Sequence, residues 1–208
     1  MKQVIHVHIP RTAGRSMMFW AKQHSHSFQH LYRSHNTQWN PAIQWTYFGH
    51  NTLDELIKNK GVLEEWWDSC FKFAFIRNTW DRLVSLYEFQ RTRKFRHSGR
   101  HWTCKYLKDF PSFIEHLCFE SESIWPKYNH KQLARLGRPV DFIGRFEKIK
   151  DDWKKVCELA EMPYFSLDKH NYVTRDKPYT EYYTPRLRHM VEERYGEEIE
   201  RFHFQFGE

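Results

Sequence analysis

The chain has 208 residues, of which 40% are apolar and 28% are charged, and its formal net charge at pH 7 is +7. This length predicts a single domain over residues 1–208, and no apolar run approaches the roughly 18 residues that a membrane-spanning helix needs. The four cysteines are widely spaced without a Cys-x-x-Cys pair, which argues against a zinc site. The basic excess points to an anionic partner.

A β-branched apolar run at residues 3–9 predicts the first strand, which Pro10 ends. Small and hydroxyl-bearing residues follow, and then a helix is expected at about 15–24. A turn of this kind directs backbone N–H groups and a helix N-terminus at one point, where a phosphate binds well. Arg11 and Arg15 add positive charge. The segment therefore predicts a phosphate-binding loop, with an ordinary strand-to-helix turn as the alternative.

This loop departs from the pattern Gly-x4-Gly-Lys-Ser/Thr that kinases and GTPases use to hold nucleotide phosphates. Gly14-Arg15-Ser16 stands where Gly-Lys-Ser would stand, and Ile9 occupies the place of the first glycine. A P-loop-type nucleotide kinase is therefore an alternative function that the missing glycine and lysine disfavour.

A polar, histidine-rich loop leads to a second predicted strand at about 44–48 and a helix at 52–59. His50 lies between them, just before the capping-box sequence Thr52-Leu-Asp-Glu55. A nearby helix N-terminus disfavours a protonated imidazole, so His50 is suited to accept a proton. We predict His50 as a general base, and a histidine that only hydrogen-bonds the helix end is the alternative.

Residues 71–76 form a short, almost wholly apolar run, which is typical of a strand buried on both faces of a parallel sheet. A long helix is expected at 79–94. Arg77 stands at the carboxyl end of the strand, where open α/β sheets bind ligands. Ser85 follows eight residues later. We expect Arg77 and Ser85 to flank one phosphate, although a helix-surface hydroxyl is the alternative for Ser85.

A variable insert on the acceptor side is expected at about 95–138, and a basic cluster from Arg91 to Arg100 leads into it. A solvated loop and a channel for an acidic acceptor both remain open as interpretations of this cluster. A strand at 141–144 and helices at 147–161 and about 185–202 follow. Strands that alternate with helices predict an α/β, P-loop-like three-layer fold with a central parallel sheet flanked by helices.

Four segments, in order, resemble the sulfotransferases that use 3′-phosphoadenosine 5′-phosphosulfate (PAPS), in a small bacterial or viral-like form. Residues 9–16 are similar to the family's loop for the 5′-phosphosulfate, and residues 75–87 are similar to its 3′-phosphate motif. Residues 142–147, and a stretch from Tyr182 to Phe202, resemble later parts of the carbohydrate and glycosaminoglycan branch.

The resemblance implies transfer of a sulfuryl group from PAPS to a hydroxyl of a carbohydrate acceptor, an acidic glycan included, with adenosine 3′,5′-bisphosphate as product and no metal. The donor-binding residues that it implies are Arg11, Thr12, Ala13, Gly14, Arg15, Ser16, Arg77, Ser85 and Lys177. Arg11 would also act in catalysis. The family usually has lysine at this position of the loop. Gly49-His50 resembles the segment that carries the base histidine of glycosaminoglycan-type enzymes.

A protein that binds adenosine bisphosphate or nucleic acid without catalysis is the non-enzymatic alternative. The 18% aromatic content would suit base stacking, but basic residues are dispersed among acidic ones over most of the chain, so no specific nucleic-acid binding is expected. Golgi relatives carry an N-terminal anchor, whereas residues 1–9 read as a strand. A cytoplasmic enzyme, or a chain trimmed of its anchor, is therefore expected.

Overall fold

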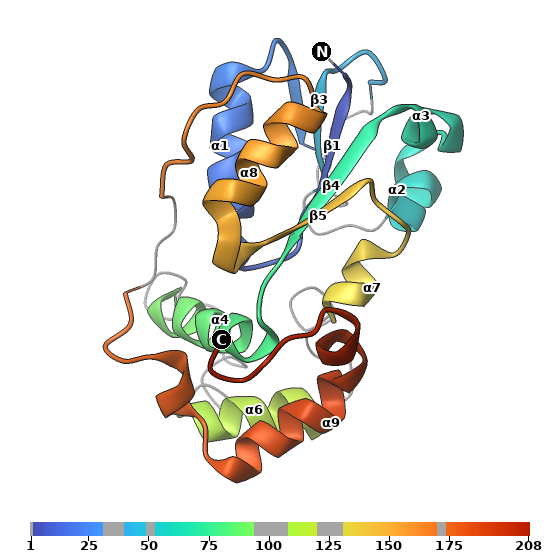
Figure 1. Cartoon of the computed structure of the whole chain (residues 1–208). Coiled ribbons are helices and arrows are strands. Elements are labelled where there is room, and N and C mark those ends of the chain that lie inside the picture. The colour runs from blue at the N-terminus through green and yellow to red at the C-terminus, as the bar shows by residue number, and fades with distance from the viewer. Residues whose placement is uncertain (1, 31–39, 49–52, 94–107, 120–130, 170–173) are drawn as a thin grey trace. The chain divides into compact units, whose positions relative to one another are not determined.

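The computed structural model describes two compact units of the chain (Figure 1). The first unit comprises Met1–Ile76 with Gln132–Asn171, and the second comprises Arg77–Lys131 with Tyr172–Glu208. The residues described within them are 2–30, 40–48, 53–93, 108–119, 131–169 and 174–208. Among these residues, no helix is both long enough and apolar enough to cross a membrane.

The first unit is built on a five-stranded parallel sheet. Its strands are β1 (Val4–Val7), β2 (Phe28–His30), β3 (Trp45–Phe48), β4 (Phe71–Ile76) and β5 (Phe142–Arg145), in the spatial order β2-β3-β1-β4-β5. The central strand β1 pairs in parallel with both β3 and β4, so that Val4 lies opposite Trp45 on one side and Phe71 on the other. The carboxyl ends of the strands therefore meet at one edge of the sheet, where the chain leaves β1 for the predicted phosphate loop.

Helices cover both faces of this sheet. They are α1 (Gly14–His24), α2 (Leu53–Lys60), α3 (Glu64–Ser69), α7 (Gln132–Leu136) and α8 (Ile149–Leu159), with a 3₁₀ turn η1 (Phe146–Lys148) before α8. Figure 1 shows α1 and α8 on one face, where Trp20 of α1 meets Trp153 of α8 with ring centroids 5.0 Å apart. On the other face, Trp67 of α3 packs against Phe48 of β3. The sheet and its two helical layers confirm the predicted three-layer α/β fold.

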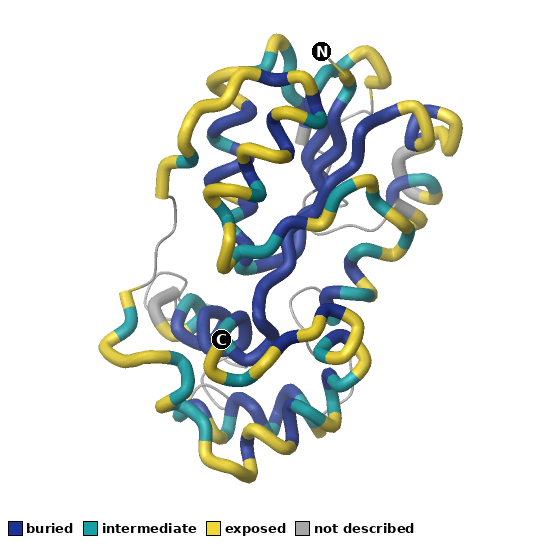
Figure 2. Tube along the Cα trace, viewed as in Figure 1, coloured by how far each residue is buried: buried dark blue, intermediate teal, exposed yellow. Residues whose placement is uncertain are grey.

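The strands β1, β3 and β4 are buried along their whole length, which explains their mostly apolar sequences, whereas the edge strand β5 is partly exposed (Figure 2). Lys72 is the charged residue of β4, and its ammonium group lies 3.3 Å from the Asp141 carboxylate. Gly144 of β5 is required by packing, because a Cβ added there would lie 2.6 Å from the ring of Phe75. These contacts fix the edge of the sheet that carries β4 and β5.

The second unit is helical where the structure describes it. It contains α4 (Thr79–Arg93), α6 (Phe110–Phe119), the 3₁₀ turn η2 (Tyr179–Tyr182) and α9 (Pro185–Arg201). The hydroxyl of Thr184 caps α9 by accepting from the Leu187 N–H, and Pro185 stands at the first position of the helix, where proline is well tolerated. A buried ion pair between Arg82 of α4 and Glu198 of α9, 3.8 Å apart, joins two helices of this unit.

The predicted strands and helices at 3–9, 15–24, 44–48, 52–59, 71–76, 79–94, 141–144, 147–161 and 185–202 are confirmed within one or two residues at most ends. The prediction of a loop after α1 is wrong in part, because β2 forms there as the edge strand beside β3. The region expected as a variable insert holds α6 and α7. Residues 94–107 and 120–130 of that region lie outside the described residues.

Candidate active site

The loop after β1 has an unusual backbone conformation. Arg11 has φ of 72° and Ala13 has φ of 63°, so two L-residues, with Thr12 between them, occupy the left-handed region that favours glycine. Each such residue costs about 1–3 kcal/mol unless its surroundings hold it, and such residues cluster at sites that bind ligands. Alternation of backbone conformation in a tight turn directs successive N–H groups inward and creates a concavity that fits an anion.

Two contacts hold this loop. The Thr12 side chain is fully buried, and its hydroxyl donates a hydrogen bond of 2.8 Å to the Ile9 carbonyl oxygen. Gly14 lies directly against the ring of His8, since a Cβ on Gly14 would be 1.9 Å from His8 Nδ1. The Thr12 hydroxyl proton is therefore used inside the loop, and the backbone N–H of Thr12 is its remaining donor for an anion.

The N-terminus of α1 has no side-chain cap. Ala13 occupies the N-cap position and has no side-chain oxygen to accept a hydrogen bond, and the first turn contains no acidic residue. A helix that begins in this way presents backbone N–H groups and the positive end of its dipole. Arg15 is exposed at the start of the helix, whereas Ser16 is buried. The six predicted loop residues, Arg11 to Ser16, thus form one group in the first unit.

Relief of the loop strain gives a first prediction. Ala13→Gly is expected to raise the free energy of unfolding by up to about 1 kcal/mol, because glycine adopts positive φ without the Cβ clash but is more flexible in the unfolded chain. Urea unfolding measures this effect. Ala21→Gly, at a buried position inside α1, is the matched control and is expected to lower the same free energy by about 1 kcal/mol or more. Equal destabilisation by both variants would contradict a left-handed Ala13.

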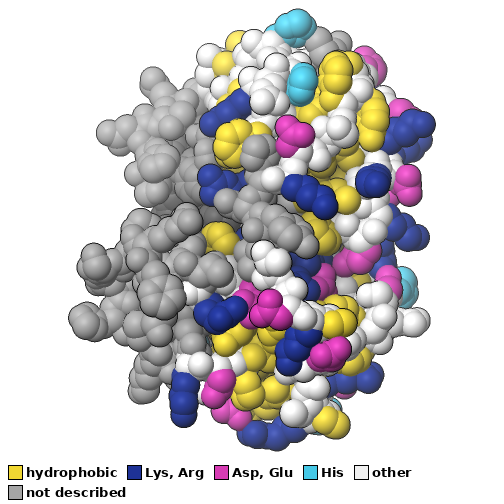
Figure 3. Space-filling view, turned by 90° about the vertical axis from the view of Figure 1, so that its left-hand side faces the viewer, with side chains coloured by type: hydrophobic (Ala, Val, Ile, Leu, Met, Phe, Trp, Pro, Cys, Tyr) yellow, Lys and Arg dark blue, Asp and Glu magenta, His cyan; other side chains and the backbone are white. Residues whose placement is uncertain are grey.

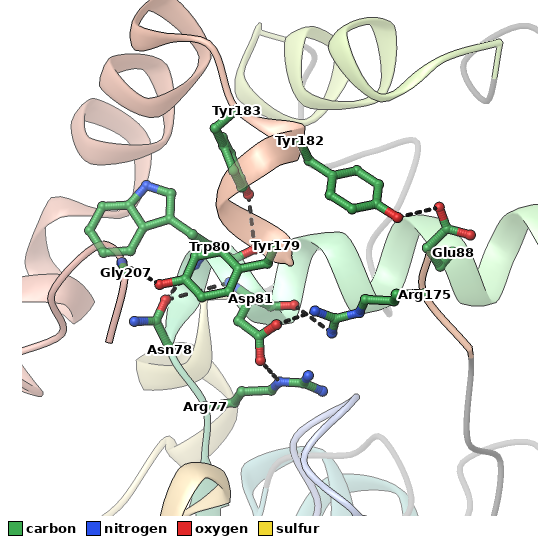
Figure 4. Close-up of polar contacts among 10 residues, drawn as sticks. All are labelled: Arg77, Asn78, Trp80, Asp81, Glu88, Arg175, Tyr179, Tyr182, Tyr183 and Gly207. Carbon is green, nitrogen blue, oxygen red and sulfur yellow. Dashed lines mark hydrogen bonds and ion pairs between the residues drawn. The ribbon is translucent and has the colours of Figure 1, made fainter. Parts of the chain in front are cut away.

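In the second unit, Arg77 is part of a charged cluster at the start of α4 (Figure 4). Arg77 Nε donates to Asp81 Oδ2 at 2.6 Å, and Arg175 pairs with the other oxygen, Asp81 Oδ1. Burial alone would raise the pKa of Asp81, but the charges and hydrogen bonds of Arg77 and Arg175 outweigh burial and lower that pKa below its usual range. Asp81 is thus a carboxylate at neutral pH. Its negative charge balances only one of the two guanidinium groups, so the cluster as a whole is positively charged.

The Arg175 contact is the feature of this cluster that sequence reasoning missed. Arg77 and Asp81 stand four residues apart across the start of α4, which is the spacing of a helical ion pair. Arg175 is 94 residues from Asp81, and nothing local in its sequence signals the contact. The guanidinium of Arg77 is therefore oriented by a carboxylate that a second arginine also holds.

Three tyrosines near η2 make further polar contacts in the second unit. The Tyr182 hydroxyl donates to Glu88 at 3.2 Å, the Tyr183 hydroxyl donates to the Trp80 carbonyl oxygen at 2.9 Å, and the Tyr179 hydroxyl accepts from the Gly207 N–H at 2.6 Å. These contacts are drawn in Figure 4. They hold the segment at 179–183, which follows Arg175 and Lys177 in the chain, against α4 and the C-terminal residues.

The remaining predicted residues are placed as follows. Ser85 is buried in α4 with 3% of its surface exposed. Lys177 is exposed; its ammonium group donates to the Glu181 carbonyl oxygen at 3.0 Å and lies 4.8 Å from the centre of the Tyr182 ring. His50 lies outside the described residues, as does most of the basic cluster from Arg91 to Arg100. Its first member, Arg91, binds Glu88 through two nitrogens at 2.9 and 2.6 Å.

Charge is mixed on the described surface. On the face drawn in Figure 3, Lys and Arg side chains are interspersed with Asp and Glu. Arg138, for example, pairs with both Asp54 and Glu64, and Arg188 pairs with Glu192. A nucleic-acid groove is normally lined by basic residues in a continuous stripe. The described residues on the face drawn in Figure 3 form no such continuous stripe, so this face gives no support to the nucleic-acid alternative.

The parallel sheet, with helices on both faces and a strained loop between β1 and α1, places the protein in the P-loop-like three-layer α/β class. A sequence profile described as "Sulfotransferase family" matches residues 1–205. A solved structure of a sulfotransferase from Alicyclobacillus acidocaldarius is also similar, with 12% identity, 97% coverage of this chain, 94% coverage of that chain and a TM-score of 0.49. The comparison with curated proteins found no match. The chain belongs to the sulfotransferase family and is a sulfotransferase, which sets the kinase alternative aside.

Proposed function

We propose that this sulfotransferase uses PAPS as its donor and transfers the sulfuryl group to a hydroxyl of a carbohydrate. The observation that carries the proposal is the strained loop of Arg11 to Ser16 at the uncapped N-terminus of α1, in a chain of the sulfotransferase family. A phosphosulfate is an anion of the kind that such a loop and helix end bind. Because the family profile covers parts of both units, we treat residues 1–208 as one sulfotransferase domain.

The loop residues have separate roles in this proposal. The backbone N–H groups of residues 12–16 hold the 5′-phosphosulfate, and the Arg15 guanidinium adds positive charge at the helix start. Arg11 stabilises the negative charge that develops on the phosphate oxygens as the bond from sulfur breaks. The family usually has lysine at this position, and arginine retains the charge on a larger, planar group.

Arg77 and Ser85 are proposed to hold the 3′-phosphate of the donor. The fit rests on Arg77, whose guanidinium is fixed through Nε by Asp81 in a cluster with a net positive charge. A fixed guanidinium forms stronger and more selective contacts with phosphate than a mobile one. Ser85 follows two turns along α4, and Lys177 supplies a further cation on the segment before η2.

His50 is proposed as the general base of the reaction. The acceptor oxygen forms a bond to sulfur as the bond from sulfur to the 5′-phosphate oxygen breaks, and His50 takes the proton of the acceptor hydroxyl. The electron pair of the broken bond leaves on the phosphate of adenosine 3′,5′-bisphosphate, and sulfur is neither oxidised nor reduced. An acidic glycan is a suitable acceptor class for a chain with a net charge of +7.

Nucleotide selectivity tests this function. Arg77→Ala is expected to weaken binding of adenosine 3′,5′-bisphosphate by about 1.5–3 kcal/mol, because one hydrogen-bonded contact to a charged phosphate is lost. Binding of adenosine 5′-monophosphate, which lacks the 3′-phosphate, is expected to change little. Isothermal titration calorimetry measures both affinities.

The matched control is Arg138→Ala, which removes another ion-paired arginine from a different part of the chain. It is expected to leave both affinities unchanged. Equal weakening of the two nucleotides by Arg77→Ala would remove Arg77 from the proposed role, and failure of the unaltered protein to bind adenosine 3′,5′-bisphosphate would remove PAPS as the donor.

A further inference from the structure

His8 lies between β1 and the anion loop and contacts the loop directly. Its ring occupies the space where a side chain on residue 14 would begin, since a Cβ on Gly14 would lie 1.9 Å from His8 Nδ1 and 2.2 Å from Cε1. His8 itself is buried, with 7% of its surface exposed. The first residue of α1 therefore lies against an imidazole ring that comes from the end of the central strand.

The His8 ring is held by an aromatic column that crosses the sheet. It stacks on Tyr47 of β3 with ring centroids 5.1 Å apart, and its edge meets His6 of β1 at 5.9 Å. His6 in turn stacks almost parallel on Phe73 of β4 at 4.7 Å. Burial lowers the pKa of His6 to about 3, so this ring is neutral at physiological pH and packs as an uncharged aromatic group. Three central strands thus fix the ring that Gly14 contacts.

The loop needs such a support. Arg11 and Ala13 occupy left-handed conformations that L-residues leave readily when nothing holds them. Thr12 is anchored from one side through its hydrogen bond to Ile9. The His8 ring supports the other side, where the loop becomes α1.

We propose that His8 is a positioning residue for donor binding: its ring holds Gly14, and with it the strained loop, in the conformation that binds the 5′-phosphosulfate. This inference rests on the proposed function of the loop. His8 acts through the backbone of residues 11–16 and makes no contact with the reacting atoms. Gly14 is required because any larger residue would displace the ring or the loop.

The test separates the two phosphates of the nucleotide. Adenosine 5′-monophosphate probes the loop, and adenosine 3′-monophosphate probes the proposed Arg77 site as an internal control. His8→Ala is expected to weaken the 5′-nucleotide by roughly tenfold or more, as loss of preorganisation does, and to leave the 3′-nucleotide within about twofold. His8→Phe retains a ring against Gly14 and is expected to restore most of the 5′-nucleotide affinity.

A double-mutant cycle with Gly14→Ala gives a second, independent measurement. In the unaltered protein, the added methyl group meets the His8 ring, so Gly14→Ala is expected to weaken the 5′-nucleotide by roughly tenfold. In the His8→Ala background the space beside residue 14 is vacant. Gly14→Ala is therefore expected to weaken binding of the 5′-nucleotide much less there than in the unaltered protein. Should His8→Ala fail to fold, the His8→Phe and Gly14→Ala single variants still report the effect of the ring on the loop.

The outcomes are distinct. If the unaltered protein binds neither nucleotide, the proposed function fails before His8 is tested. If it binds both, and His8→Ala weakens them equally or not at all, His8 has no positioning role. Equal cost of Gly14→Ala in both backgrounds would also overturn the inference, as would Gly14→Ala without any loss of 5′-nucleotide affinity.

Discussion

Replacement of His50 by alanine is expected to lower the rate of sulfuryl transfer by roughly 10²–10⁴-fold, which is the usual contribution of a positioned general base. A base acts on the acceptor proton in the chemical step and does not hold the nucleotide. Affinity for adenosine 3′,5′-bisphosphate and the melting temperature are therefore expected to stay near their original values. Initial rates with a carbohydrate acceptor measure the effect, after a screen in which acidic glycans are tried early.

His189→Ala is the matched control for this prediction, since His189 is an exposed histidine on α9 that pairs with Glu193 at 3.4 Å. It is expected to retain nearly full turnover. The opposite pattern for His50→Ala, with a lower melting temperature and unchanged turnover per folded molecule, would mean that His50 only braces the helix that begins after it. Slow hydrolysis of PAPS does not substitute for the acceptor assay, because a reaction in which water attacks the sulfur does not require His50 as the base.

Loss of the Glu198 carboxylate is expected to produce the largest change in stability. Glu198 is fully buried, lies 3.8 Å from the buried Arg82 guanidinium and accepts a hydrogen bond of 2.7 Å from the Thr79 hydroxyl. Glu198→Ala leaves a charge buried without its partner, which typically lowers the free energy of unfolding by about 3–5 kcal/mol. Urea unfolding followed by circular dichroism measures the change.

The neighbouring residue supplies the control for this experiment. Glu197 pairs with Lys131 at 3.7 Å, but its side chain is 71% exposed. Exposed ion pairs contribute little, so Glu197→Ala is expected to change stability by less than about 1 kcal/mol. Equal effects of the two substitutions would show that the pair between Arg82 and Glu198 is not the buried link between α4 and α9 that the structure describes.

The fold is largely predictable from the sequence where one pattern dominates a segment. The run at 71–76 is almost wholly apolar, as expected of a strand buried on both faces of a parallel sheet, and all its residues are buried. Helix α8 keeps Trp153, Val156 and Cys157 at helical spacing, and these residues are buried as the spacing predicts. Strand β2 is missed because it has only three residues and its pairing with β3 supplies the stabilisation that its own sequence lacks.

The candidate site is predictable in composition but not in geometry. Pro10 to Ser16 contain the residue types of an anion loop, and Arg77 follows a buried strand. Intrinsic preference does not predict positive φ at Arg11 and Ala13, since L-residues avoid that region. The contacts of His8 with Gly14 and of Arg175 with Asp81 depend on tertiary structure. Local rules thus fail at the strained loop, which is the kind of place where such failures are expected.

The most direct test of PAPS as the donor is a crystal structure of the protein with adenosine 3′,5′-bisphosphate. We expect the 5′-phosphate within about 2.7–3.2 Å of backbone N–H groups of residues 12–16, and the 3′-phosphate at the Arg77 guanidinium and Ser85. Both contacts are expected in the same molecule of nucleotide. A nucleotide bound elsewhere, or crystals grown with saturating nucleotide in which the loop holds no phosphate, would contradict the proposed function.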